Sequence, residues 1–162
     1  MLTKLAELNS ELGKHKLPGN TGETGCWDLI SKWRRLCEME HASCSMPTNG
    51  SLWFPTRLLD VSPTDSNTPR LVIVKDEKPL AIQSYLALSH CWGKSKILTL
   101  KSSNIKAMQQ ALPLTELPRN FRQAIQATKI LGFRYLWIDS LCIIQDSIED
   151  WRKRSCRNGQ SI

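Results

Sequence analysis

The stretch Tyr135-Leu-Trp-Ile-Asp-Ser-Leu-Cys-Ile-Ile-Gln-Asp146 joins a hydrophobic segment to a cluster of polar residues. Its first part, Tyr135–Ile138, is apolar and aromatic throughout, which predicts a β-strand covered on both faces. Asp139 and Ser140 follow directly. In open parallel α/β sheets, ligands bind beyond the carboxyl ends of the strands, so both residues are candidate functional positions. The alternative interpretation is that Asp139 only caps the next turn.

Helical signals precede this strand. Pro118 suits the first turn of a helix, and Gly132 stands where that helix would end with positive φ. The side chains between them that recur at helical spacing are Phe121, Ala124, Ile125 and Thr128. The sequence therefore predicts a helix that leads directly into the strand.

A second helix is predicted after the strand. Residues 147–150 resemble a capping box, and the side chains expected on one face of the helix are Ile144, Ile148, Trp151 and Ser155. Helix, strand and helix in this order predict a parallel sheet. The predicted partner strand is 84–92, which ends at Gly93 and leads through residues 99–112 toward the helix at Pro118.

Upstream, the pattern changes to short elements. Residues 26–41 are predicted to form a helix, and 57–61 and 71–74 give β signals separated by turn residues. They predict an antiparallel meander with segment 80–88 next. The expected organisation is a flexible N-terminal extension over 1–25, a leader of helix and short β meander over 26–80, and an α/β domain over 81–162.

Composition limits the class of protein. The 162 residues are 41% hydrophobic, which is enough for a core and excludes wholesale disorder. The net charge of +7 favours loose association with acidic surfaces, but no nucleic-acid-binding motif is present. Residues 1–16 resemble a short amphipathic helix, with no signal peptide and no segment of membrane-spanning length. The six cysteines are therefore expected to be cytosolic thiols.

One constellation has metal-ligand character. Cys37, His41 and Cys44 are spaced as Cys-x3-His-x2-Cys, with Cys26 as a candidate fourth ligand. Zinc takes such donors tetrahedrally, although this spacing is not that of a standard zinc finger. The alternative is partly buried thiols beside a surface histidine, so no metal is expected.

Hydrolase and nucleotide-binding interpretations have less support. A hydrolase would need a residue of the sequence Ser89-His90-Cys91 to act with Asp139 or Cys142, and neighbouring strand residues point to opposite faces, which argues against a local dyad. A carboxylate near Cys142 would also raise the pKa of its thiol. A P-loop is excluded because Leu88 stands where its first glycine belongs.

Four sequence blocks, in order, carry a family resemblance. They are residues 85–93, 117–125 and 131–146, followed by Asp150-Trp151, and they resemble the fungal heterokaryon incompatibility (HET) domain. Upstream, residues 55–61 and the Cys37–His41–Cys44 pattern resemble the leader of many such proteins. The positions that match the family motif are Tyr85, Ser89, Trp92, Gly93, Leu117, Pro118, Ala124, Ile125, Leu131, Gly132, Tyr135, Trp137, Ile138, Asp139, Cys142, Gln145, Asp146 and Trp151.

The resemblance implies a role in fungal non-self recognition and programmed cell death. It implies a cytoplasmic signalling module that acts on other incompatibility or death-pathway proteins, with a homo-oligomer as a further partner, no specific nucleic acid and no membrane span. The family has also been compared with Toll/interleukin-receptor-type (TIR) domains. The expected fold class is therefore α/β, a partial TIR-like or flavodoxin-like parallel sheet with flanking helices, preceded by the helical and antiparallel β leader.

The comparison with TIR domains raises an enzymatic alternative, since some of them cleave NAD through a helix-borne glutamate. HET domains usually have Asp-Trp-x-x-Glu on the helix after the strand, and Arg154 takes the glutamate position here. A guanidinium would repel an oxocarbenium-like transition state, so the expectation leans away from an enzyme. Asp139 and Ser140 remain the catalytic candidates, and no cofactor is expected, with zinc and NAD as the alternatives.

The final residues also depart from the family. Asn158 takes the place of a usual methionine, and the sequence ends at Ile162, where the family continues into another strand. The expectation is a C-terminally truncated HET domain, with a non-functional remnant as a further alternative. The cationic residues Arg152, Lys153, Arg154 and Arg157 are expected to form a solvated face of the last helix.

Overall fold

The computed structural model describes residues 20–41, 54–64, 68–76, 82, 84–93 and 96–152. The chain divides into two compact units, residues 1–52 and 53–162. The expected extension and amphipathic helix over residues 1–19 lie outside the described residues. The boundaries expected at residues 25 and 80 stay predictions.

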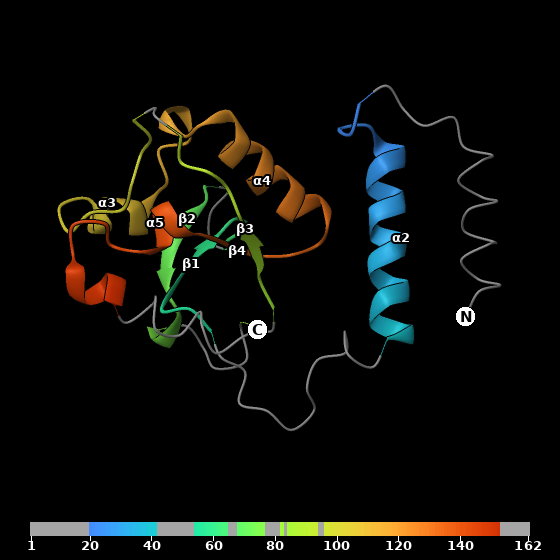
Figure 1. Cartoon of the computed structure of the whole chain (residues 1–162), viewed down its shortest axis with the longest axis horizontal. Coiled ribbons are helices and arrows are strands. Elements are labelled where there is room, and N and C mark those ends of the chain that lie inside the picture. Colours follow the sequence, from blue (N-terminus) through green and yellow to red (C-terminus); the bar gives the residue numbers. More distant parts are fainter. Residues whose placement is uncertain are drawn as a thin grey trace. The chain divides into compact units, whose positions relative to one another are not determined.

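In the first unit, helix α2 (Thr24–Glu40) confirms the predicted helix over 26–41 (Figure 1). The indole Nε1 of Trp27 donates to the carbonyl oxygen of Gly22 at 3.2 Å, which holds the chain entering the helix. Further along, Arg34 and Glu38 form an ion pair at 2.7 Å with the i,i+4 spacing that helices favour. No residue of α2 is buried. None of the described helices is long and apolar enough to cross a membrane.

The described part of the second unit contains a four-stranded sheet in the order β2-β1-β4-β3 (Figure 1). Its strands are β1 (Arg57–Asp60), β2 (Arg70–Ile73), β3 (Leu86–Leu88) and β4 (Tyr135–Ile138). The β3 and β4 strands are parallel, with Leu88 opposite Ile138, which confirms the predicted partner strand. The β1 strand runs antiparallel to both of its neighbours.

The expectation of a parallel sheet with a separate antiparallel leader is therefore wrong in one respect. The antiparallel β1–β2 pair is present, but β1 also pairs with β4, so the leader strands and the β3–β4 pair form one mixed sheet. The β3 strand does not continue the meander, since it pairs with β4 rather than β2. The rest of the predicted segment 80–88 is only partly described. The physical reason is that β4 has two edges, and β3 covers only one of them.

Between β3 and β4 the chain forms helices α3 (Ile105–Gln110) and α4 (Arg119–Ile130), with the short 3-10 turn η2 (Leu114–Glu116) between them. The α4 helix follows Pro118 and ends before Gly132, which has φ +78°, as the sequence predicted. After β4 the chain enters the single turn α5 (Asp139–Cys142) at once. A second 3-10 turn, η1 (Val74–Asp76), follows β2.

Successive side chains of each strand point to opposite faces of the sheet, and the sheet therefore carries two hydrophobic clusters. One face of the sheet packs against α3, α4 and α5, and its buried members include Leu59, Leu71, Leu136, Ile138, Met108, Phe121, Ile125 and Leu141. The other face holds a smaller cluster of Leu58, Val72, Ile82 and Tyr135. The β4 strand contributes to both clusters, so the prediction that it is covered on two faces is confirmed.

A buried ion pair fixes the start of β4 against the end of β1. The carboxylate of Asp60 is fully buried and accepts from Arg134 Nη2 at 2.7 Å and from Nε at 3.0 Å. Next to it, Val61 N donates to the carbonyl oxygen of Arg134 at 2.9 Å. This bidentate pairing compensates a charge that would otherwise be costly to bury.

Candidate functional site

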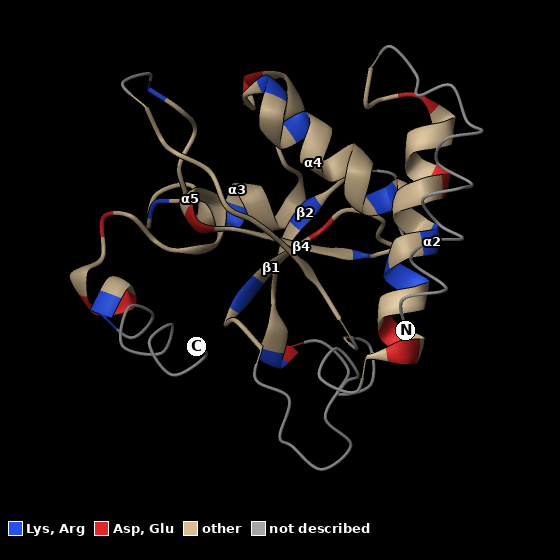
Figure 2. Ribbon diagram, turned by 45° about the vertical axis from the view of Figure 1, so that its right-hand side comes forward, with Lys and Arg blue, Asp and Glu red and all other residues tan. Residues whose placement is uncertain are grey.

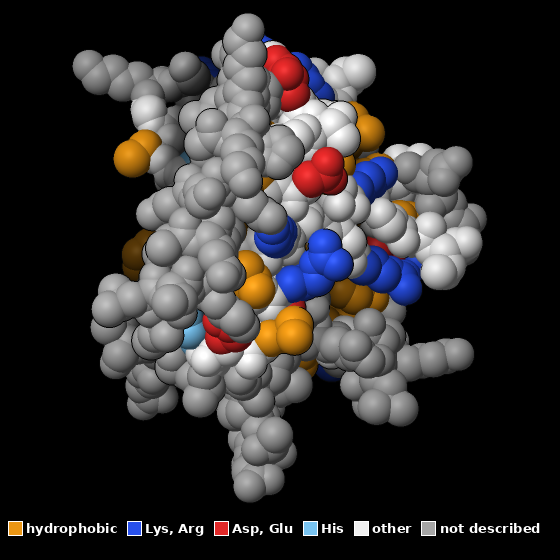
Figure 3. All heavy atoms as spheres, turned by 90° about the vertical axis from the view of Figure 1, so that its right-hand side faces the viewer, with side chains coloured by type: hydrophobic (Ala, Val, Ile, Leu, Met, Phe, Trp, Pro, Cys, Tyr) orange, Lys and Arg blue, Asp and Glu red, His pale blue; other side chains and the backbone are white. Residues whose placement is uncertain are grey.

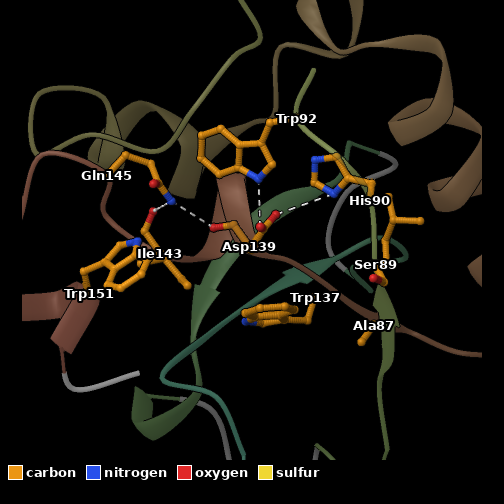
Figure 4. Close-up of a pocket in the computed structure, with 10 residues that line it drawn as sticks. Ala87, Ser89, His90, Trp92, Trp137, Asp139, Ile143, Gln145 and Trp151 are labelled. Carbon is orange, nitrogen blue, oxygen red and sulfur yellow. Dashed lines mark hydrogen bonds and ion pairs between the residues drawn. The ribbon is translucent and has the colours of Figure 1, made fainter. Parts of the chain in front are cut away.

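An open pocket of about 730 Å³ lies at the carboxyl ends of β3 and β4 (Figure 4). Its lining consists of Ala87, Leu88, Ser89, His90, Trp92, Trp137, Asp139, Ile143, Gln145 and Trp151. The pocket forms because the chain leaves the sheet after Leu88 and after Ile138, where the parallel ladder ends. The carboxyl edge of a parallel strand pair is the usual place for a ligand in an α/β sheet.

Asp139 occupies the centre of this pocket and is about two-thirds buried. Its Oδ1 accepts from the backbone N–H of Ser140 at 2.7 Å, and its Oδ2 accepts from the indole Nε1 of Trp92 at 2.8 Å. The carboxylate therefore joins two sequence blocks that are 47 positions apart. The carboxylate contacts the first turn of α5, as the capping interpretation expects. It also faces the pocket, as the functional-site interpretation expects.

His90 lies beside Asp139, with its Nδ1 3.6 Å from Asp139 Oδ1. That separation allows electrostatic attraction but is too long for a hydrogen bond. The imidazole is enclosed by aromatic rings: the Phe121 ring meets it edge-on at 4.7 Å between centroids, and the Trp92 ring stacks on it at 6.4 Å. Only 8% of the His90 side chain is exposed, and neither ring nitrogen has a hydrogen-bond partner among the described residues.

Gln145 closes the loop that follows α5. Its amide Nε2 donates to the carbonyl oxygens of Ile143 at 3.0 Å and Asp139 at 3.2 Å, as Figure 4 shows. Its backbone N–H donates to the carbonyl oxygen of Leu100 at 2.9 Å. Gln145 thus holds the backbone on which the pocket is built.

Ser140, the second catalytic candidate, is fully buried and does not line the pocket. Its carbonyl oxygen accepts from Leu100 N at 2.8 Å, and its hydroxyl has no hydrogen-bond partner among the described residues. Cys142 is also buried, as expected for a small hydrophobic side chain. The candidate roles of Asp139 and Ser140 stay predictions, but only Asp139 is placed to meet a ligand.

Trp151 enters the site from the turn of helix at residues 148–152. The helix begins as the capping box predicted, since Asp150 N donates to Ser147 Oγ at 3.2 Å. The carboxylate of Asp150 accepts from Ile144 N at 2.8 Å and from the guanidinium of Arg57.

Arg57 connects β1 to the site. It is almost fully buried, and its Nε donates to the carbonyl oxygen of Cys142 at 2.9 Å while its Nη2 pairs with Asp150. One side chain therefore holds both the end of α5 and the start of the helix that carries Trp151. Sequence patterns did not assign Arg57 an individual role, because an arginine in a β signal is ordinarily exposed.

Two further motif positions have altered acidity. The pKa of Asp146 is lowered, chiefly because the backbone N–H of Ser102 donates to its carboxylate, at 2.9 Å to Oδ1. Burial raises the pKa of Tyr85, whose ring packs at 6.1 Å from that of Phe54. Asp146 anchors the segment before α3, and neither residue lines the pocket.

Most other family-motif positions form the scaffold. The fully or partly buried positions outside the pocket are Leu117, Pro118, Ala124, Ile125, Leu131, Tyr135 and Ile138. Gly93 and Gly132 have positive φ, of +65° and +78°, which other residues adopt only with strain. The motif therefore combines a core, two turns and a pocket.

The metal candidates are only partly described. The Sγ of Cys37 lies 3.4 Å from His41 Nδ1, while Cys44 lies outside the described residues. Within the described part of the chain, no group of three or more His, Cys, Asp or Glu side chains could hold a metal ion. Of the predicted cationic face, Arg152 is exposed, and Lys153, Arg154 and Arg157 lie outside the described residues.

Charged side chains of both signs occur in both units (Figure 2). Figure 2 shows Lys and Arg spread over strands and helices of the second unit. On the face drawn in Figure 3, hydrophobic side chains appear as separate groups between basic and acidic ones.

His90 lines the pocket, although it was not among the site residues predicted from the sequence. The sequence analysis combined His90 with Asp139 only in the hydrolase interpretation, which had less support, whereas the structure places His90 Nδ1 3.6 Å from Asp139 Oδ1. The available signal was register: both residues follow the ends of parallel strands, so their side chains can meet at one edge. Trp92 and Gln145 were named for the resemblance, and the structure gives them their contacts.

Comparison with protein-family models matches residues 85–159 to the family described as heterokaryon incompatibility protein (HET). Comparison with curated proteins and with solved structures found no match. The matched segment contains β3, α3, α4, β4 and α5, and with them the residues that line the pocket. The match is consistent with the four sequence blocks and with membership of this chain in the heterokaryon incompatibility family.

Proposed function

We propose that this chain is a signalling module of the heterokaryon incompatibility type, which acts in fungal non-self recognition and triggers growth arrest or cell death through protein interaction. The observation that carries the proposal is the family match over residues 85–159. The site geometry supports it, because Trp92, Asp139 and Trp151 from three separate motif blocks meet at one pocket. We place the module in the cytoplasm, with other death-pathway proteins or a second copy of the chain as partners.

A second candidate function is a TIR-like enzyme that cleaves NAD. It is supported by the parallel β3–β4 pair with its helical crossover and by a carboxylate at the end of β4. The antiparallel β1 strand next to β4 departs from a flavodoxin-like sheet. In this candidate the family glutamate is replaced by Arg154, so the chain would be a disabled enzyme.

Inducible expression in a fungal cell tests the first function. The wild-type chain is expected to stop growth, and Asp139→Asn is expected to abolish the effect at equal levels of soluble protein. Asp76→Asn is the matched control, because it makes the same change at an exposed position away from the pocket. Wild-type expression without any loss of growth would contradict the proposal.

Cellular NAD measured in the same cultures separates the two candidates. Growth arrest with unchanged NAD, in both the wild type and an Arg154→Glu variant, supports an interaction module. NAD loss that appears only with Arg154→Glu supports the disabled enzyme. The melting temperature of Asp139→Asn must stay close to that of the wild type. If the variant were unfolded, the loss of growth arrest would show a structural role for Asp139 and not a role in signalling.

A further inference from the structure

We propose that the pocket between β3 and β4 binds a compact organic cation of the quaternary ammonium class, such as a trimethylammonium group. The inference goes beyond the signalling role and does not depend on it, since binding is a property of the isolated protein. It rests on the aromatic lining, on the hydrogen bonds that the Asp139 carboxylate already accepts, and on buried polar atoms that have no partner among the described residues.

Three indole rings contribute to the lining. Trp92 follows β3, Trp137 belongs to β4, and Trp151 comes from the helix after α5. In Figure 4 Trp92 and Trp137 lie on opposite sides of Asp139, and Trp151 lies beside Ile143. Tryptophan faces attract cations most strongly among aromatic side chains, and groups of such rings are the usual recognition device for quaternary ammonium ions.

The carboxylate favours a cation that has no N–H donors of its own. Each oxygen of Asp139 already accepts one short hydrogen bond, from Ser140 N at 2.7 Å and from Trp92 Nε1 at 2.8 Å. These bonds fix the carboxylate while its negative charge remains in a partly buried position. A primary ammonium requires several acceptors, whereas a trimethylammonium group requires only charge and apolar contact.

The rest of the lining is compatible with a positive ligand. Among the described residues that line the pocket there is no lysine or arginine, and the remaining side chains are largely apolar. A negatively charged ligand would meet Asp139 without a compensating cation from this lining. The charge of the pocket therefore selects against anions.

Two buried polar groups indicate that the pocket is built for an occupant. The imidazole of His90 is more than nine-tenths buried, and its Nε2 has no hydrogen-bond partner among the described residues. The same holds for the indole Nε1 of Trp137, which is buried at the pocket wall. Buried polar atoms in folded proteins nearly always have a partner, so these two leave hydrogen-bonding capacity for a bound molecule or its water.

The test uses choline and its neutral isostere dimethylbutanol, in which carbon replaces the charged nitrogen. Binding to the full chain is followed by heteronuclear NMR of the indole N–H signals, of which the six tryptophans provide one each. Choline is expected to shift the signals of Trp92, Trp137 and Trp151 with millimolar affinity, and to leave Trp33 on α2 unchanged. The isostere is expected to bind at least about tenfold more weakly, since it lacks the charge.

Variants then assign the binding to the pocket. Asp139→Asn is expected to weaken choline binding by about tenfold and to leave the isostere unaffected. Trp151→Leu changes a ring that is 54% exposed and is also expected to weaken choline binding. Trp33→Leu is the matched control on the exposed helix α2 and is expected to have no effect.

Three results would overturn the proposal. Equal affinity for choline and dimethylbutanol would show that the pocket is merely apolar. Absence of any shift at the three pocket tryptophans would show that it takes no such cation. Choline binding that survives both Asp139→Asn and Trp151→Leu would place the cation elsewhere. Growth arrest in the fungal assay does not enter these outcomes, so the signalling proposal stands or falls separately.

Discussion

Replacing Arg57 by methionine is expected to cost about 3 to 5 kcal/mol in the free energy of unfolding of the second unit. The guanidinium is 7% exposed and the Asp150 carboxylate 16% exposed, so removal of the cation leaves a largely buried negative charge. The same substitution removes the donor that Arg57 Nε supplies to the carbonyl oxygen of Cys142. Such a charge-assisted hydrogen bond contributes about 1.5 to 3 kcal/mol, which is part of the total rather than an addition to it.

Urea denaturation, with linear extrapolation to water, measures this cost. The signal is the Trp137 indole resonance, which belongs to the second unit. Arg34→Met is the matched control, because it breaks an exposed i,i+4 ion pair on α2 that contributes less than about 0.5 kcal/mol. A double-mutant cycle with Asp150→Asn should give a coupling energy of about 1 to 3 kcal/mol.

The cost of Arg57→Met shows whether residues before the matched segment 85–159 are needed to hold the pocket together. Arg57 lies outside the segment 85–159 that matches the family model, yet it holds the helix that carries Trp151. A cost below about 1 kcal/mol, or a coupling energy near zero, would refute the reasoning, because solvent would then screen the pair. In that case the helix at residues 148–152 would be held by other contacts.

Three further changes test the scaffold. Trp137→Ala should lower the free energy of unfolding, measured by urea denaturation, by about 2 to 4 kcal/mol. This is near the lower end for tryptophan, because the ring is only partly buried. A loss below about 1 kcal/mol would contradict the packing of Trp137 against both clusters. The pKa of Asp146 is lowered in the folded protein, so the hydrogen bonds that it accepts from Ser102 stabilise the fold at pH values above the ordinary carboxyl pKa of about 3.9. This stabilisation is lost as the pH falls through the pKa that Asp146 has in the folded state. Wild type should therefore exceed Asp146→Asn in melting temperature at pH of about 6, and the difference should shrink below a pH of about 3; a constant difference would exclude this linkage. Gly132→Ala should cost about 1 to 2 kcal/mol in the free energy of unfolding, because φ at Gly132 is +78°. Gly25→Ala inside α2 should instead raise helicity in circular dichroism. If both variants were equally stabilising or equally destabilising, the argument from positive φ would be refuted.

Local sequence patterns predicted the elements around the site well. Pro118, the apolar spacing that includes Phe121, and Gly132 located α4, and the aromatic run located β4. These signals succeed because capping, helical periodicity and positive φ depend on a few neighbouring residues. The Ser147 cap formed for the same reason.

Strand pairing was predicted only in part. The parallel contact of β3 with β4 followed from the order of elements, whereas the antiparallel contact of β1 with β4 did not. The sequence of a strand does not determine beside which of two free strand edges in a sheet it will pair. Residues 57–60 therefore appeared to belong to a leader, although they lie at the centre of the sheet.

The sequence by itself determined the resemblance to the heterokaryon incompatibility family, the α/β class and the position of Asp139 at the end of a buried strand, because each depends on motifs or periodicity within short segments. Only the tertiary structure decided that His90 and Trp92 meet Asp139, that Ser140 turns away from the pocket, and that Arg57 holds Asp150. Those contacts join residues 47 to 93 positions apart. They depend on sheet order and register, which the whole chain sets through the burial of its core.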